Sequence, residues 1–259
     1  MFEGVYTALV TPFKNDRIDY TALEGIIEAQ VEGGVDGVVP VGTTGESPTL
    51  SFEEHKEYIQ RVVALVNKRV KVIAGTGSNS TREAVHLSSA AQEYGVDGVL
   101  LVNPYYNKPP QRGLIAHFET IAKSITVPAI LYNIPGRTGI NFMPDSILEL
   151  LGRAPNIVAI KEATGDIGQM MRTIELCGDR LTLLSGDDNL LLPVLAIGGK
   201  GVISVLSNVL PSDIKRIVTL FNEGKIGESR ALFYKILPLC RAMFIETNPI
   251  PVKAAMEMM

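Results

Sequence analysis

The stretch Gly95-Val-Asp-Gly-Val-Leu-Leu-Val102 echoes an earlier one, Gly34-Val-Asp-Gly-Val38. Each copy leads from a segment of helical periodicity, through a short turn, into an apolar run typical of a strand. The spacing between the copies corresponds to two βα units of roughly 30 residues each. The echo therefore predicts that helices and strands alternate along the chain.

Short runs rich in Val, Ile and Leu recur along the whole sequence. They are continuously apolar rather than alternating, which is typical of parallel strands buried on both faces. Segments with the spacing of amphipathic helices separate them, among them Ser51–Val66, Thr81–Tyr94 and Pro211–Asn222. The expected strands are Gly4–Val10, Gly37–Val41, Val70–Ala74, Gly98–Val102, Ala129–Tyr132, Ile157–Ile160, Leu181–Leu184 and Gly201–Val205.

This alternation over 259 residues fits one (β/α)8 barrel, an α/β fold of roughly 250 residues. An open doubly wound sheet is the alternative, because it has the same alternation. We expect the barrel to occupy residues 1–224 and a helical extension to occupy 225–259. The extension holds an amphipathic segment, Ile226–Ile245, and a last helix after Asn248 that reaches Met259 without a capping residue. The missing cap suggests a chain that has been cut short.

The composition excludes several classes of protein. Hydrophobic residues make up 46% and charged residues 20%, which is ordinary for a globular chain. A net charge of −4 and no basic tract argue against nucleic-acid or membrane binding. The N-terminal residues lack the pattern of a signal peptide, and two cysteines, Cys177 and Cys240, form no disulfide framework. We expect a cytoplasmic protein.

Active sites of such barrels lie at the C-terminal ends of the strands. The second expected strand is followed by Gly42-Thr-Thr-Gly-Glu46, where hydroxyls and N–H groups could cradle a small carboxylate. A polar turn is the alternative interpretation. The fourth strand is followed by Asn103-Pro-Tyr-Tyr-Asn107, which is either a rigid loop of the site or partly buried packing. On the residues alone, both alternatives stay open.

The next two strands end in residues that can carry chemistry. The fifth ends in Tyr132, and the loop after it contains Arg137, whose guanidinium suits a carboxylate. A surface arginine in a turn is the alternative. The sixth strand ends in Ile157-Val-Ala-Ile-Lys161. Burial disfavours the charged form of a lysine amine, so Lys161 is a candidate Schiff-base nucleophile.

The remaining polar motifs predict structural roles. We expect the pair Asp187-Asp188 to cap a helix. Gly198-Gly-Lys-Gly201 precedes a strand, on the wrong face for a phosphate site, and is expected to form a turn. No metal site is expected, because the histidines fall on three successive helices away from the strand ends: His55, His86 and His117.

Seven motifs occur in order along the chain: GTTGE, NPYYNKP, YNIPGRTG, IKEATGD, SGDD, GVISV and NPIPVK. Together they resemble the dihydrodipicolinate synthase family of pyruvate-dependent class I lyases, from Val5 to Lys253. The resemblance implies a lyase of lysine and diaminopimelate biosynthesis that condenses pyruvate, held as a Schiff base on Lys161, with L-aspartate 4-semialdehyde. It implies no metal and no organic cofactor.

The resemblance also implies roles around the pyruvate. Thr43 and Thr44 hold its carboxylate, and Thr44 joins a proton relay. Tyr132 moves protons to and from the imine. Tyr106 completes the relay from a neighbouring subunit, so the resemblance implies a homo-oligomer in which a dimer is the minimal active unit and a tetramer is common.

For the second substrate, the resemblance assigns the semialdehyde carboxylate to Arg137 and backbone contacts to Gly186 and Ile203. Relatives that act on 2-oxo sugar acids lack this arginine, so Arg137 favours the synthase over such an aldolase or lyase. Family members typically continue beyond the position of Met259. The extension at 225–259 is therefore expected to be incomplete, and a catalytically impaired barrel is a third hypothesis.

Family members that are inhibited by lysine bind it at a subunit interface. Here Phe52 stands where sensitive members often carry histidine, and Pro48 stiffens the same loop. We therefore expect weak or absent lysine inhibition. The polar positions that match this candidate site are Ser47, His55, Asn79, Glu83 and Tyr105.

Overall fold

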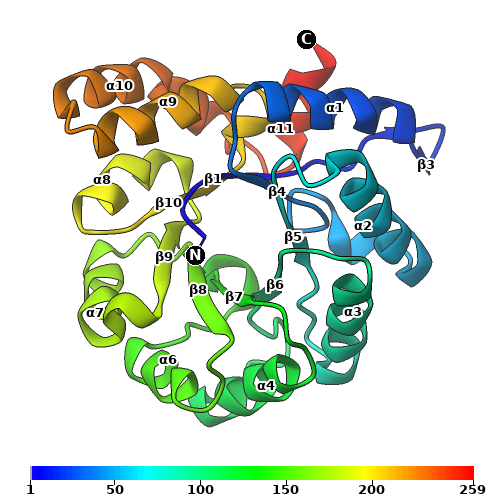
Figure 1. The fold of residues 1–259 in the computed structure, drawn as a ribbon, viewed down its shortest axis with the longest axis vertical. Coiled ribbons are helices and arrows are strands. Elements are labelled where there is room, and N and C mark those ends of the chain that lie inside the picture. Colours follow the sequence, from blue (N-terminus) through cyan, green and yellow to red (C-terminus); the bar gives the residue numbers. More distant parts are fainter. Residues whose placement is uncertain (1) are drawn as a thin grey trace.

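The computed structural model describes residues 2–259 and forms a closed barrel of parallel strands (Figure 1). Each barrel strand pairs with the next barrel strand along the chain, and β10 returns to pair with β1. The predicted (β/α)8 barrel is confirmed, and the open sheet is wrong. The barrel strands are β1 Gly4–Ala8, β4 Gly37–Val39, β5 Lys71–Gly75, β6 Gly98–Val102, β7 Ala129–Asn133, β8 Ile157–Glu162, β9 Thr182–Ser185 and β10 Gly201–Ser204.

Two glycines allow the barrel to close. Gly201 on β10 lies opposite Gly4 on β1, and a Cβ atom on Gly201 would lie 1.8 Å from the carbonyl oxygen of Gly4. Gly4 also has a φ of +95°, a conformation that side chains disfavour. The glycine-rich turn before β10 is therefore structural, as its position predicted.

Helices cover the outside of the barrel (Figure 1). The helix α2 begins with a capping box. The Ser51 hydroxyl accepts from the Glu54 N–H, and the Glu54 carboxylate accepts from the Ser51 N–H. The helices around the barrel are α1 Tyr20–Glu32, α2 Phe52–Val66, α3 Thr81–Glu93, α4 Gln111–Lys123, α6 Pro144–Leu151, α7 Ile167–Cys177, α8 Leu191–Ala196 and α9 Pro211–Asn222, and the short turns are α5 Pro135–Thr138, η1 Ser47–Thr49, η2 Gly178–Arg180, η3 Asp188–Leu190 and η4 Leu206–Asn208.

A small hairpin after β1 was not predicted. It pairs β2 (Phe13–Lys14) with β3 (Arg17–Ile18), and both residues of its turn, Asn15 and Asp16, have positive φ. Strands this short carry no readable periodicity. The Asn-Asp pair was the available signal, because these residues tolerate the left-handed conformation of a tight hairpin turn.

Two helices follow α9. The helix α10 (Ile226–Ala242) packs on α9, where the Ser229 hydroxyl donates to the Ile217 carbonyl at 2.9 Å, and it ends before the predicted Ile245. The last helix, α11, spans Ile250–Glu257. The segment between them returns to the C-terminal end of the barrel, where Asn248 contacts Thr44 and Arg137.

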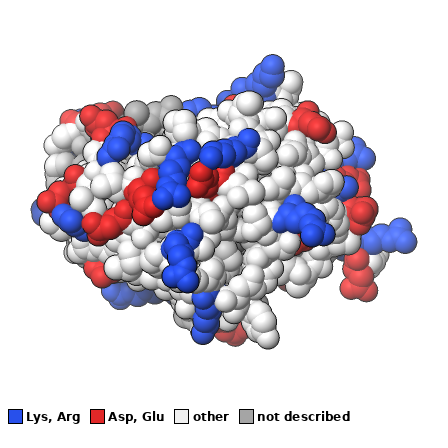
Figure 2. Space-filling view, turned by 90° about the horizontal axis from the view of Figure 1, so that it is seen from below, with Lys and Arg blue, Asp and Glu red and all other residues white. Residues whose placement is uncertain are grey.

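Charges of both signs lie side by side on the face shown in Figure 2. Among the ion pairs of the surface, Arg153 contacts both Glu119 and Glu149. Exposed pairs of this kind contribute little to stability. Among residues 2–259, none of the helices combines the length and hydropathy needed to cross a membrane.

His117 on α4 is expected to make the stability of the fold pH-dependent. It is 6% exposed, its Nδ1 lies 2.8 Å from the Thr81 hydroxyl, and burial lowers its pKa to about 4. Between pH 6.5 and 4 the unfolded chain therefore binds a proton that the folded chain does not. We expect the free energy of unfolding to fall by about 3 kcal/mol across that range on account of His117.

Urea unfolding at several pH values measures this loss. His117→Asn, which keeps an acceptor for Thr81, is expected to flatten the slope by about one proton. The same change at the exposed His86 serves as the control. An unaltered slope in His117→Asn would show that His117 does not bind a proton differently in the two states.

Candidate active site

Lys161 and Tyr132 lie together at the C-terminal end of the barrel. They are register partners on the adjacent strands β8 and β7, and each side chain is 5% exposed. The Lys161 Nζ lies 4.2 Å from the centroid of the Tyr132 ring. The two residues predicted to make and protonate an imine are thus in contact, and the lysine is buried rather than solvated.

Two acidic residues follow β9 close to this lysine. Burial raises the pKa of Asp187, and the nearby charge of Lys161 opposes that rise. Asp188 is 1% exposed, and one of its carboxylate oxygens accepts from the N–H groups of Val205 and Leu206 at 2.9 Å. The prediction that the pair caps a helix is wrong, because neither side chain caps the short helix that starts there. Asp188 instead holds the loop after β10.

The loop after β4 carries the two threonines. It turns tightly, since the N–H of Gly45 donates to the Gly42 carbonyl and the N–H of Glu46 donates to the Thr43 carbonyl, both at 3.1 Å. Thr44 is 2% exposed, and its hydroxyl accepts from the Asn248 side chain at 3.0 Å. The turn places Thr43 in the lining of two cavities.

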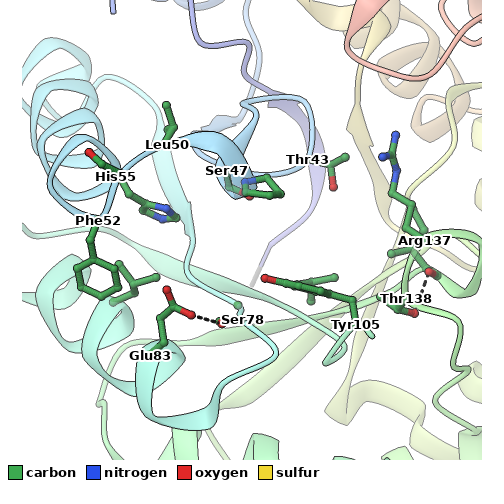
Figure 3. A pocket seen from close by; sticks show the side chains of 16 residues that line it. Thr43, Ser47, Leu50, Phe52, His55, Ser78, Glu83, Tyr105, Arg137 and Thr138 are labelled. Carbon is green, nitrogen blue, oxygen red and sulfur yellow. Dashed lines mark hydrogen bonds between the residues drawn. The ribbon is translucent and has the colours of Figure 1, made fainter. Parts of the chain in front are cut away.

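Two adjoining cavities open at this end of the barrel. The smaller, about 30 Å³, is lined by Thr43 and Tyr132. The larger, about 480 Å³, is lined by Thr43 and by Arg137 on the loop after β7 (Figure 3). Arg137 is exposed, and its Nη2 donates to the Asn248 carbonyl at 2.9 Å. A small ligand at Tyr132 and a carboxylate at Arg137 would therefore lie in neighbouring spaces.

Gly186 and Ile203 lie on the neighbouring strands or directly after them. A Cβ atom on Gly186 would lie 2.6 Å from the Ala163 Cβ, so only glycine fits beside the end of β8. Ile203 is fully buried on β10. The backbone contacts that the resemblance implies for Gly186 and Ile203 stay predictions.

Tyr106 is the predicted site residue that this chain does not bring into its own site. Its side chain is 89% exposed, and its backbone is left-handed with a φ of +69°. The adjacent Tyr105 instead lines the larger cavity. The structure thus separates the two tyrosines that the sequence presented as one motif.

Most of the predicted lysine-site residues line the larger cavity (Figure 3). Phe52 and Pro48 are also in its lining, and Phe52 packs against His86 with ring centroids 5.3 Å apart. Asn79 is not in the lining and bonds with Asn107 instead. The predicted residues that do line the cavity are Ser47, His55, Glu83 and Tyr105.

Two of these polar groups already have partners. The His55 Nε2 lies 2.8 Å from the Gly75 carbonyl, and burial lowers the pKa of His55. Glu83 accepts from the Ser78 hydroxyl at 2.5 Å. Within the described range 2–259, no three His, Cys, Asp or Glu side chains cluster in a way that could hold a metal ion.

The full length of the chain, residues 1–259, matches the model of the dihydrodipicolinate synthetase family. The chain belongs to this family. A relative named 4-hydroxy-tetrahydrodipicolinate synthase, from Leptospira biflexa serovar Patoc, is 56% identical over 99% of this chain and 87% of its own length. The predicted resemblance is therefore confirmed.

Solved structures of family members agree with this. The 4-hydroxy-tetrahydrodipicolinate synthase from Methylacidiphilum fumariolicum SolV is 50% identical, with a TM-score of 0.99 over 100% of this chain and 86% of that one. The chloride-inhibited dihydrodipicolinate synthase from Acinetobacter baumannii, complexed with pyruvate, is 41% identical, with a TM-score of 0.96 over 99% of this chain and 88% of that one. This member of the family therefore shares their fold along its whole length.

Two residues of this family member's site were not predicted from the sequence. The sequence predicts a helix cap for Asp187, although a position just after a strand end also signals the site. Asn248 lies far along the chain in the NPIPVK motif, whose sequence alone predicts no role for it. Only the folded chain brings Asn248 to Thr44 and Arg137.

Proposed function

We propose that this protein is a 4-hydroxy-tetrahydrodipicolinate synthase that condenses pyruvate with L-aspartate 4-semialdehyde. The observation that carries the proposal is the buried Lys161 amine against the Tyr132 ring at the open end of the barrel. Relatives bearing that name cover nearly all of the chain. The proposal thus rests on a site and on a family together.

In the proposed reaction, the Lys161 Nζ attacks the carbonyl carbon of pyruvate and water leaves, which gives an imine. The protonated imine withdraws electrons, so that a methyl proton is lost and an enamine forms. The enamine carbon attacks the aldehyde carbon of the second substrate. The amine of the product then displaces Lys161 by transimination as the ring closes.

The surrounding groups suit the proton transfers and binding steps. Thr43 and Thr44 hold the pyruvate carboxylate, and Tyr132 and Thr44 move protons to and from the reacting atoms. Arg137 takes the semialdehyde carboxylate with its planar pair of donors. Gly186 and Ile203 contribute backbone contacts.

Turnover assays test the proposal against its alternatives. We expect product from pyruvate with L-aspartate 4-semialdehyde and none from 2-oxo sugar acids. The carboxylate of a 2-oxo sugar acid belongs to its pyruvate half, so no second carboxylate is available to Arg137. Turnover of sugar acids alone would select the aldolase. An intact fold that turns over neither substrate class would favour the catalytically impaired barrel.

We further propose that the protein works as a homo-oligomer in which Tyr106 reaches the relay of a neighbouring subunit. The 89% exposed side chain and left-handed backbone of Tyr106 support this, since the ring projects away from its own barrel. Mixing inactive Lys161→Met and Tyr106→Ala proteins is expected to restore turnover. Each mixed dimer then holds one site with both residues.

The mixing experiment has a clear contrary result. If Tyr106 acted within its own chain, every site of a mixed dimer would lack one residue, and activity would stay absent. Mixing Lys161→Met with Tyr132→Phe is the control. Both residues lie in one site, so no activity is expected to return.

Weak lysine inhibition also stays a prediction. The cavity offers Glu83 and Tyr105 to an amino acid, but Phe52 takes the place of a polar partner and packs on His86. Initial rates are expected to change little with added L-lysine. A micromolar inhibition constant would contradict this.

A cytoplasmic location, and the division into a barrel at 1–224 and an extension at 225–259, likewise stay predictions.

A further inference from the structure

The segment 248–253 near the C-terminus connects three parts of the site. The Asn248 Nδ2 donates to the Thr44 hydroxyl at 3.0 Å, and the Asn248 carbonyl accepts from Arg137 at 2.9 Å. Five residues later, the Lys253 Nζ donates to the Glu46 carboxylate at 2.6 Å and to the Thr11 carbonyl at 3.0 Å. The loop that carries Thr43 and Thr44 is therefore held from the far end of the chain.

We propose that Asn248 is a positioning residue that sets the direction in which Thr44 passes its proton. This inference rests on the proposed function, because it assigns Thr44 to the proton relay. It adds a residue to that relay, and it gives a role to the first residue of the NPIPVK motif.

The Thr44 hydroxyl can both donate and accept hydrogen bonds. The Thr44 oxygen has one hydrogen to donate and two lone pairs to accept with. An amide N–H from Asn248 occupies one lone pair. The Thr44 hydrogen must then be donated to some group other than Asn248. A relay needs this polarity, because a hydroxyl bound the other way would give its proton to the amide oxygen.

Burial makes this polarity firm. Asn248 is 6% exposed and Thr44 is 2% exposed, so solvent does not compete for the bond. The Asn248 Oδ1 is buried and has no hydrogen-bond partner within the described part of the chain. Rotating the amide by half a turn would bury both of its N–H donors without Thr44 as an acceptor. The observed orientation instead leaves one N–H and the carbonyl oxygen without a protein partner, and a buried carbonyl oxygen tolerates this better than a buried N–H.

The two bonds of Asn248 come from different parts of the residue, which makes the proposal testable. Thr44 is bound by the side chain, whereas Arg137 is bound by the backbone carbonyl. Removing the side chain should therefore disturb proton transfer without disturbing the binding of the semialdehyde. A merely structural role would affect both.

The experiment measures kcat and the KM for L-aspartate 4-semialdehyde in a double-mutant cycle. Asn248→Ala is expected to lower kcat about 10- to 100-fold with little change in KM. In the presence of Thr44→Val it is expected to cause almost no further loss, because the partner is already gone. Asn248→Asp keeps the shape but offers only acceptors at neutral pH, so it should lower kcat at least as much as Asn248→Ala.

Asn156→Ala is the matched control. Asn156 lies just before β8, at the opposite end of the barrel, and its amide donates to the carbonyls of Ala122 and Ile125. The loss of this side chain is therefore expected to cost stability but not kcat. Wild-type kcat in Asn248→Ala, losses that add to those of Thr44→Val, or a KM that rises as much as kcat falls would each overturn the proposal. If Asn248→Ala does not fold, Asn248→Asp decides by the same criteria.

The proposed function can fail separately from this inference. Borohydride reduction of the wild-type protein with pyruvate reports imine formation at Lys161 and does not depend on Asn248. If no adduct forms, the proposed function fails. If the adduct and turnover are present and Asn248→Ala keeps the wild-type kcat, only the role of Asn248 fails.

Discussion

Replacing Lys161 with methionine is expected to lower turnover of pyruvate and L-aspartate 4-semialdehyde on the order of 10⁴-fold or more. The methionine side chain has about the same length but no amine, so no imine can form. Binding of pyruvate by Thr43 and Thr44 should persist. The loss is therefore expected in kcat, and no covalent adduct should be recovered.

The variant is expected to fold. Methionine fills nearly the same volume as lysine, and volume-conserving changes are tolerated best. Burial already raises the pKa of Asp187, and removal of the nearby Lys161 charge would raise it further. Lys200→Met, in the exposed turn before β10, controls for the loss of a lysine. Turnover of Lys161→Met close to that of the control would exclude a Schiff base at this position.

Replacing Arg137 with alanine is expected to lower kcat/KM for the semialdehyde about 10²- to 10⁴-fold while pyruvate still forms its imine. A guanidinium can give a carboxylate two charge-assisted hydrogen bonds, each worth about 1.5–3 kcal/mol. Arg137 lines the larger cavity, whereas Lys161 and Tyr132 contact each other and are not part of that lining. The effect should therefore fall on the second substrate alone.

Arg137→Lys separates charge from geometry. It keeps the positive charge but loses the planar pair of donors, so an intermediate loss is expected. Adduct formation with pyruvate, followed by mass spectrometry, runs in parallel with the kinetics. An equal loss of imine formation and semialdehyde use would show that Arg137 supports the site as a whole rather than one substrate.

The barrel could be predicted because its signals are local. Continuous apolar strands, the Ser51 cap and the echo at positions 34 and 95 each fix an element or its direction. The strand ends then predicted the site, since the C-terminal edge of a barrel collects them. Lys161 and Tyr132 were found in this way, and the structure brings them into contact.

What escaped prediction depends on contacts between distant segments. Aspartate is a common N-cap residue, but the Asp188 carboxylate accepts hydrogen bonds from the backbone N–H groups of Val205 and Leu206 after β10. Asn248 meets Thr44 across more than half of the chain's length. Neither contact leaves a periodic or spacing signal. The predicted role of Tyr106 requires a second subunit, which no pattern within one chain can supply.

The most direct test of the Schiff-base site is to incubate the protein with pyruvate, reduce it with borohydride and sequence the modified peptide by mass spectrometry. We predict one reduced pyruvyl adduct per chain, on Lys161, that is absent without pyruvate and absent from Lys161→Met. No adduct, or an adduct on another lysine, would contradict the account.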